Sequence, residues 1–267
     1  MNKNMSKNIQ KTEGIVTKHI PIGEADRIVT LISPSIGKIR AVARGSRKPK
    51  SKMGGHLIPI TRVKISVANT KTIDQITEVE TIESFRKIKE DLYLLSKASY
   101  MTELAENFVQ EHSESKQIFN LLLQCITLLQ IAPDIEILVK FFEIKLMSQT
   151  GFKPEMIICS ECGTKLVPGS YKFSFESGGL LCHQCAGKIH SFTEKLSTNS
   201  IKLIRFIQNE NFEKIAKLNS TKNLLEEIER VISGYMRSIL DKELKTKPFL
   251  DLIAKQTKNS ITSKNTL

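Results

Sequence analysis

Two pairs of cysteines give the sequence its clearest chemical signal. Cys159 and Cys162 form one C-x2-C pair, Cys182 and Cys185 form another, and 19 residues separate the pairs. This spacing is typical of a four-cysteine zinc module, in which each pair presents two thiolates to the ion from one turn. Four thiolates complete a tetrahedron, so we expect one structural zinc ion with no open position for water.

The alternatives for these cysteines are disulfides or a redox pair. A reducing cytoplasm argues against structural disulfides, and no thioredoxin-like strand and helix surround the pairs. His183 and His190 are possible substitute ligands, but four cysteines already suffice, and we expect both histidines to face solvent. Cys125 falls in the apolar stripe of a predicted helix and is expected to be a small core residue rather than a nucleophile.

A hairpin and a set of helices must position the cysteines. The alternating segment 171–175, followed by Gly178 and Gly179, predicts a hairpin that returns the chain to the first pair. Apolar residues with helical spacing predict amphipathic helices on both sides of the module. These stripes span 92–108, 118–129, 137–145, 201–207 and 224–240.

The first third of the chain has a different periodicity, typical of strands. Segments rich in Ile, Val and Thr are separated by turn residues and a longer loop at 45–55, and they predict five strands. The expected strands are 14–20, 27–33, 37–44, 57–68 and 73–85. Five strands in so short a segment favour a closed OB-fold barrel, because closure removes exposed sheet edges.

Charge is concentrated in the same region. The 267-residue chain carries a net charge of +12, and residues 1–85 hold 15 basic and seven acidic side chains. Eleven basic residues and no acidic one lie between Asp26 and Asp74, a bias that indicates a polyanionic partner such as nucleic acid. Strand alternation places an aliphatic core inside the barrel and cations outside. The candidate nucleic-acid-binding residues are Arg27, Lys38, Arg40, Arg44, Arg47, Lys48, Lys50, Lys52, Arg62 and Lys64.

No aromatic residue precedes Phe85, and the chain has no Trp. The predicted barrel therefore offers no ring on which a base could stack, and phosphate contacts must supply most of the binding. We expect salt-dependent binding to both single and double strands, with comparable affinity for the two at low salt.

The motifs of common enzymes are missing from the sequence. It contains no phosphate-binding GxxxxGK[ST] loop, HExxH helix, GxSxG elbow or GxGxxG fingerprint, so we expect a binding protein and no enzyme. Glu24 and Asp26 could form the carboxylate pair of a metal nuclease, but a solvated or capping role at a turn and strand start is commoner. The opening residues lack the apolar core of a signal peptide, and we expect a soluble, cytoplasmic, nucleoid-associated protein without membrane contact.

The expected fold class is α+β with several domains: an OB-fold barrel, then an α-helical domain that carries a four-cysteine zinc-binding insertion. The expected boundaries are a flexible N-terminus at 1–12, the barrel at 13–85, the helical domain at 86–155 and 188–250, the zinc module at 156–187 and a flexible tail at 251–267.

Several motifs, taken in order, resemble the bacterial recombination mediator family RecO. The resemblance lies in the segments 13–16, 23–26, 43–51, 100–104, 142–154 and 175–182 together with the first cysteine pair, and it covers roughly residues 12–250. It weakens at 244–250, so no partner contact is transferred to that segment. The basic barrel surface of the family corresponds here to Lys38, Arg40, Arg44, Arg47, Lys48 and Lys50.

The resemblance implies a DNA-binding repair protein without catalytic residues. RecO-like proteins bind single- and double-stranded DNA, anneal complementary strands and, with RecR, help RecA replace single-strand-binding protein. The acidic, apolar C-terminal tail of single-strand-binding protein implies a groove with basic groups in the helical domain, for which Lys140, Lys145 and Arg205 are candidates, although each could equally be a solvated helix charge. The alternative is a zinc-ribbon RNA-binding or transcription-associated factor.

Overall fold

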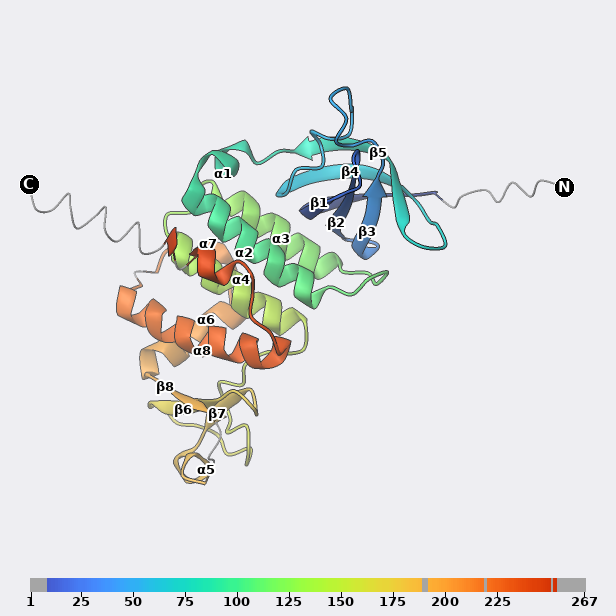
Figure 1. Ribbon diagram of the computed structural model, residues 1–267. Helices are drawn as coiled ribbons and strands as arrows, with labels where there is room; N and C mark the ends of the chain where they lie inside the picture. Colours follow the sequence, from blue (N-terminus) through green and yellow to red (C-terminus); the bar gives the residue numbers. More distant parts are fainter. Residues whose placement is uncertain (1–8, 189–191, 219, 251, 254–267) are drawn as a thin grey trace, which may run out of the picture. The chain divides into compact units, whose positions relative to one another are not determined.

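The computed structural model describes residues 9–188, 192–218, 220–250, 252 and 253. The chain divides into two compact units, one formed by 1–130 with 245–267 and the other by 131–244 (Figure 1). Of the segments expected to be flexible, 1–12 and 251–267, residues 1–8, 251 and 254–267 lie outside the described residues, as does His190, whereas residues 9–12 belong to a strand and 252 and 253 are helical. The expected boundary at 85 stays a prediction. No helix within the described residues is long and apolar enough to cross a membrane.

A closed five-stranded barrel forms the first part of the chain. Its strands are β1 (Ile9–Ile22), β2 (Asp26–Ser33), β3 (Gly37–Ala43), β4 (Thr61–Ala68) and β5 (Asp74–Glu83), hydrogen-bonded in the closed order β1-β2-β3-β5-β4. Every strand pair is antiparallel except β3 with β5. This arrangement confirms the predicted OB-like barrel.

Alternation along the strands fills the barrel with aliphatic side chains. Ile39, Ala41 and Ala43 of β3 point inward, and the inward residues of the other strands, such as Val29 and Val63, join them in one buried core. The predicted bounds are wrong by several residues at two strand starts, since β1 begins at Ile9 and not at residue 14, and β4 begins at Thr61 and not at residue 57. Ile60, immediately before β4, has a φ of 58°, and its amide hydrogen-bonds to the Val16 carbonyl.

After the barrel this unit contains the helices α1 (Arg86–Glu90), α2 (Leu92–Phe108) and α3 (Lys116–Leu129), and residues 247–250, 252 and 253 are also helical. Asp91 caps α2 by accepting hydrogen bonds from the amides of Tyr93 and Leu94. The Glu103 carboxylate accepts hydrogen bonds from the amides of Lys245 and Thr246, 2.8 Å in each case. Residues 245 and 246 are thereby attached to α2.

The second unit is mainly helical. It contains α4 (Ile135–Gln149), α6 (Thr198–Asn209), α7 (Phe212–Ile215) and α8 (Lys222–Leu240), which pack on one another and confirm the predicted helical stripes (Figure 1). Between α4 and α6 the chain forms a three-stranded sheet of β6 (Tyr171–Ser174), β7 (Gly179–Leu181) and β8 (Thr193–Leu196), with the short α5 (His183–Ala186).

The sheet rests closely against α8. The Phe173 ring makes an edge contact with the Tyr235 ring, with centroids 5.3 Å apart. A Cβ on Gly234 would lie 2.6 Å from Cζ of Phe175, so only glycine permits this approach. The predicted hairpin is thus present as β6 and β7, and α8 supports it.

Candidate nucleic-acid interface and four-cysteine cluster

The loop between β3 and β4 carries the densest group of exposed cations. Arg44, Arg47, Lys48, Lys50 and Lys52 are all exposed there, and Arg40 is exposed on the outer face of β3. We call these six residues the basic loop surface.

Hydrogen bonds hold this loop against the β1–β2 turn. The Arg47 amide donates to the Ala25 carbonyl at 2.8 Å, and Arg47 Nη1 donates to the Gly23 carbonyl at 2.9 Å. The Gly45 amide donates to Asp26 Oδ1 at 2.7 Å. Two segments of the resemblance, 23–26 and 43–51, therefore contact each other, and the loop has a defined position before any ligand binds.

The interior of the loop is tightly packed. A Cβ on Gly54 would lie 2.3 Å from the Ser46 carbonyl oxygen, so a larger residue at 54 would displace the backbone. Arg27 Nη1 donates to the Gly54 carbonyl at 3.2 Å. Ser46 Oγ is buried and has no hydrogen-bond partner among the described residues. Among the buried side-chain nitrogen and oxygen atoms of the described residues, it is the only one without a hydrogen-bond partner.

The other candidate cations are in different surroundings. Arg27 is half-buried, and the half-buried Lys38 donates from Nζ to the Glu106 carbonyl at 3.4 Å. Arg62 forms an ion pair with Glu13, with its Nε 2.8 Å from Oε2. Lys64 stands in register between Glu13 of β1 and Glu80 of β5. Acidic side chains of β1 and β5 therefore lie next to the cations of β4. The sequence does not reveal this, because no acidic residue occurs between positions 26 and 74.

Asp26 has a structural role in positioning the basic loop. Its carboxylate accepts a hydrogen bond from the Gly45 amide, whereas Glu24 is exposed, so the two residues match the capping and solvated roles respectively.

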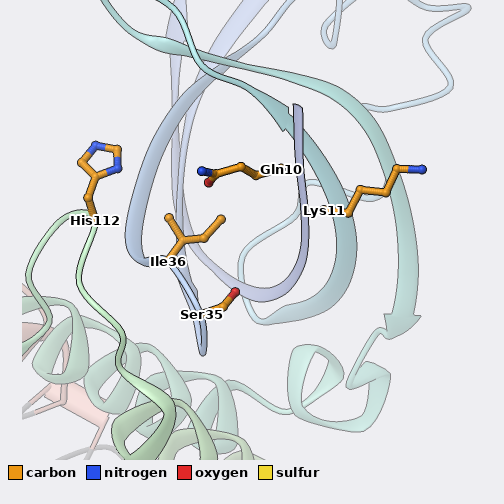
Figure 2. Close-up of a pocket in the computed structure, with 5 residues that line it drawn as sticks. All are labelled: Gln10, Lys11, Ser35, Ile36 and His112. Atoms are coloured by element: carbon orange, nitrogen blue, oxygen red, sulfur yellow. The ribbon is translucent and has the colours of Figure 1, made fainter. Parts of the chain in front are cut away.

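A separate pocket of about 450 Å³ lies in the same unit (Figure 2). It is lined by Gln10, Lys11, Ser35, Ile36 and His112. Ser35 Oγ is 2.8 Å from Thr12 Oγ1, and Figure 2 shows the His112 ring turned away from Ser35. Ser35 and His112 therefore do not form a serine–histidine pair in this arrangement.

The four cysteines of the second unit converge as predicted. Their Sγ atoms all lie within 4.8 Å of one another, and Sγ of Cys162 is 3.8 Å from Sγ of Cys182. Zinc–sulfur bonds of about 2.3 Å in a tetrahedron require sulfur–sulfur distances of about 3.8 Å. The cluster therefore fits a four-thiolate metal site. His183 is exposed, as expected.

Local hydrogen bonds shape both cysteine turns. The Cys182 amide donates to Sγ of Cys159 at 3.3 Å, and the Cys185 amide lies 3.5 Å from Sγ of Cys182. Hydrogen bonds with Thr164 lower the pKa of Cys162 to about 6, whereas a hydrogen bond with Cys182 raises the pKa of Cys185 to about 12. Thiols this close cannot all ionise unless a cation offsets their repulsion.

The helical cations proposed to form a groove are engaged within their own unit. Lys140 is 3% exposed and forms ion pairs with Glu143 and Glu229, so it is neither a solvated charge nor available at a groove. Lys145 Nζ donates to the Gln208 carbonyl at 3.0 Å. Arg205 Nε donates to the Met156 carbonyl at 2.7 Å. The helical periodicity of the sequence does not show which lysine and arginine side chains are held by such contacts and which are solvated.

Cys125 is fully buried in α3, and burial raises the pKa of its thiol. This result confirms its expected role as a core residue.

An OB-like barrel with an exposed basic loop, followed by helices that carry four clustered cysteines, defines a class of protein that combines a small barrel with a helical part containing a possible metal site. Comparisons with known sequences identify the member of this class. The family profile described as "Recombination protein O N terminal" matches residues 5–85, and "Recombination protein O C terminal" matches residues 89–248. The chain belongs to the RecO family.

Relatives named DNA repair protein RecO align along nearly the whole chain. The protein of Dehalococcoides mccartyi is 37% identical over 245 residues, which are 92% of this chain and 96% of the relative. The protein of Roseiflexus sp. is 30% identical over 256 residues, 96% of this chain and 90% of the relative. That of Bacillus pumilus is 31% identical over 241 residues, with coverage of 90% and 93%.

Proposed function

We propose that this protein acts as a recombination mediator that binds single- and double-stranded DNA through the basic loop surface. The observation that carries the proposal is the anchored loop at 44–52, where five exposed cations extend from a backbone that is hydrogen-bonded to Asp26 and Ala25. The side chain of one of them, Arg47, is also hydrogen-bonded to the Gly23 carbonyl. Cations on a preformed support lose little conformational entropy when they contact phosphates. Family membership favours this function over the RNA-binding or transcription-associated alternative.

The proposed activity consists of binding, with no catalytic step. By neutralising phosphates, the basic loop surface would reduce repulsion between two complementary strands, which is the electrostatic requirement for annealing. The family further implies RecR and the C-terminal tail of single-strand-binding protein as partners, with RecA assisted indirectly. Lys145 and Arg205, both half-buried, remain the proposed basic groups for the tail.

We also propose that the four cysteines hold one structural zinc ion. Sulfur ligands and tetrahedral spacing suit Zn²⁺, which has no geometric preference of its own. When bound, the ion would link the turn at 159–162 to the turn at 182–185 and neutralise the crowded thiolates. Cys159 is buried and the other three cysteines are partly or fully exposed, so the ion would lie near the surface of the module.

The test compares two variants that lose the same charge. Arg44→Gln with Lys48→Gln removes two cations of the basic loop surface, and Arg62→Gln with Lys64→Gln removes two cations of β4. Fluorescence anisotropy with a labelled strand and its duplex should show weaker binding of both forms by the first variant. In a plot of the logarithm of the association constant against the logarithm of the salt concentration, the slope should become less steep by about 1.4 to 1.8, because two phosphate contacts are lost.

The β4 variant is the control for net charge and should change these quantities little. Equal losses in the two variants would contradict the proposed site, since only total charge would then matter. Annealing of complementary strands, measured with the same proteins, should follow the loss of binding by the Arg44 and Lys48 variant.

A further inference from the structure

Backbone contacts hold the two cysteine turns side by side. The Ser160 amide donates to the Leu180 carbonyl at 2.9 Å. The Glu155 amide donates to the Gly178 carbonyl, and the Glu155 carbonyl accepts from the Leu180 amide, 3.0 Å in each case. A Cβ on Gly179 would lie 2.7 Å from Cβ of Glu155, so the two chain segments approach closely. The sulfur atoms of the two turns are therefore kept together by the polypeptide itself.

The four thiols differ in their access to solvent. Cys159 is 1% exposed, Cys182 and Cys185 are half-buried, and Cys162 is exposed. An oxidant that arrives from solvent therefore reaches Sγ of Cys162 first. Sγ of Cys182, in the other turn, lies 3.8 Å from Sγ of Cys162 and is itself partly accessible. The accessible pair of sulfur atoms thus joins one turn to the other.

We propose that Cys162 is a site of oxidation by peroxides, and that Cys182 converts the oxidised residue to a disulfide with release of the zinc ion. This inference rests on the proposed zinc site and assigns a second, metal-free form to it. In reducing compartments, protein disulfides are commonly transient and redox-sensing, which suits a pair of cysteines near the surface.

The reaction is a two-electron oxidation by one molecule of peroxide. The Cys162 thiolate attacks one peroxide oxygen, the O–O bond breaks, and a sulfenic acid and a hydroxide ion are formed. The Cys182 thiolate then attacks the sulfenic sulfur, the S–S bond forms, and a second hydroxide ion leaves. Cys159 and Cys185 remain as two thiolates, which are half of the ligands that a structural zinc ion requires.

The disulfide would replace the metal as the link between the turns. It closes a loop between positions that are 20 residues apart, and such a cross-link restricts the unfolded chain. The contact of Phe173 with Tyr235 of α8 does not involve the cysteines and should persist. The oxidised protein should therefore melt at a higher temperature than reduced protein from which zinc has been removed by a chelator.

The test treats the zinc-loaded protein with one equivalent of hydrogen peroxide. A colorimetric zinc chelator should report one ion released for each disulfide formed. The free thiols, counted after unfolding, should fall from five to three in each converted chain. Mass spectrometry of peptides should locate the disulfide between Cys162 and Cys182, and Cys125, which is buried in α3, should stay reduced.

Two histidine variants distinguish the oxidised residue from an ordinary ligand. Cys162→His keeps a nitrogen that can bind zinc but removes the proposed site of oxidation, so peroxide should release its zinc about fivefold more slowly or not at all. Cys185→His is the matched control, because it changes a ligand that takes no part in the disulfide, and its zinc should be released as in the unmodified protein. Equal rates of release in the two variants would overturn the inference.

Peptide mapping of the unmodified protein decides the question even where a variant does not bind zinc. Disulfides formed only within one turn, or zinc retained after peroxide treatment, would overturn the inference and leave the proposed zinc site intact. Absence of zinc from protein purified under reducing conditions with zinc supplied would overturn the proposed zinc site together with this inference.

Discussion

The carboxylate of Asp26 accepts a hydrogen bond of 2.7 Å from the backbone amide of Gly45, where the chain leaves β3 for the basic loop. Gly45 has a φ of 65°, a conformation that glycine adopts without strain. One acidic residue thus fixes the origin of a cationic loop.

Asp26→Ala should weaken DNA binding although it removes a negative charge. Removal of a negative charge would by itself strengthen binding to a polyanion. Loss of the carboxylate, however, removes the hydrogen bond that holds the loop, so that ordering its cations on DNA costs more conformational entropy. We expect a loss of about fivefold, on the order of 1 kcal/mol. Anisotropy titrations can measure it, with Glu24→Ala as the control of equal charge. Tighter binding by both variants would show that the anchor is unimportant.

Ser46→Ala should leave the free protein as stable as before or stabilise it by up to about 1 kcal/mol. The buried hydroxyl has no hydrogen-bond partner among the described residues, so its removal relieves a desolvation cost. Urea unfolding measures this change. Ser66→Ala is the contrasting variant, because Ser66 Oγ donates a hydrogen bond to Glu78 at 2.7 Å. Loss of this hydrogen bond should destabilise the folded protein. A clear destabilisation by Ser46→Ala would show that the hydroxyl has a partner in solution.

Lys140→Met should destabilise the protein by about 3 to 5 kcal/mol, because it leaves Glu143 buried without its cation. Adding Glu143→Gln should recover much of this loss, since the remaining side chain is neutral. Chemical denaturation of the single and double variants provides the comparison. If the single variant were as stable as the unmodified protein, the buried ion pair would not form in solution.

Lys140 should also contribute to the pH dependence of stability. Burial lowers its pKa, but the charges of Glu143 and Glu229 outweigh burial and raise the pKa above the ordinary 10.5. A group whose pKa is raised by folding stabilises the folded state fully below its unfolded pKa. Its contribution should therefore be complete below pH 10.5 and decline as the pH rises toward the folded pKa. The difference in the free energy of unfolding between the unmodified protein and Lys140→Met should therefore decrease as the pH is raised across this range.

Protein purified from zinc-containing medium should contain one zinc ion per chain. Cys162→Ser should reduce this content and lower the melting temperature, because three thiolates hold the metal less tightly and the metal contributes to folding. Cys125→Ala is the control, since that cysteine is buried in α3 and should not affect metal content. Full zinc content in Cys162→Ser would exclude it as a ligand.

The barrel and the cysteine cluster could be predicted because each depends on local patterns. Strand alternation placed Ile39 and Ala41 inside, and the two C-x2-C turns define their own ligand geometry. The surroundings of single charges depend on register between distant strands. Nothing near Lys64 in the sequence indicates that Glu13 and Glu80 flank it, because both pairings form only when the barrel closes.

The burial of Lys140 escaped prediction for the same reason. Its partner Glu229 lies 89 residues away in α8, so the sequence near α4 shows only another helical lysine. The unequal exposure of Cys159 and Cys162 likewise arises from packing in the folded module and is not apparent in the spacing of the cysteines.

The attachment of Lys245 and Thr246 to Glu103 bears on how the chain is synthesised. These partners are separated by 142 and 143 residues, and most of the intervening chain forms the second unit. At a translation rate of about 5 to 20 residues per second, Lys245 and Thr246 are synthesised on the order of ten seconds after Glu103. The helical, cysteine-bearing unit is therefore fully translated before the unit that contains the barrel can be completed.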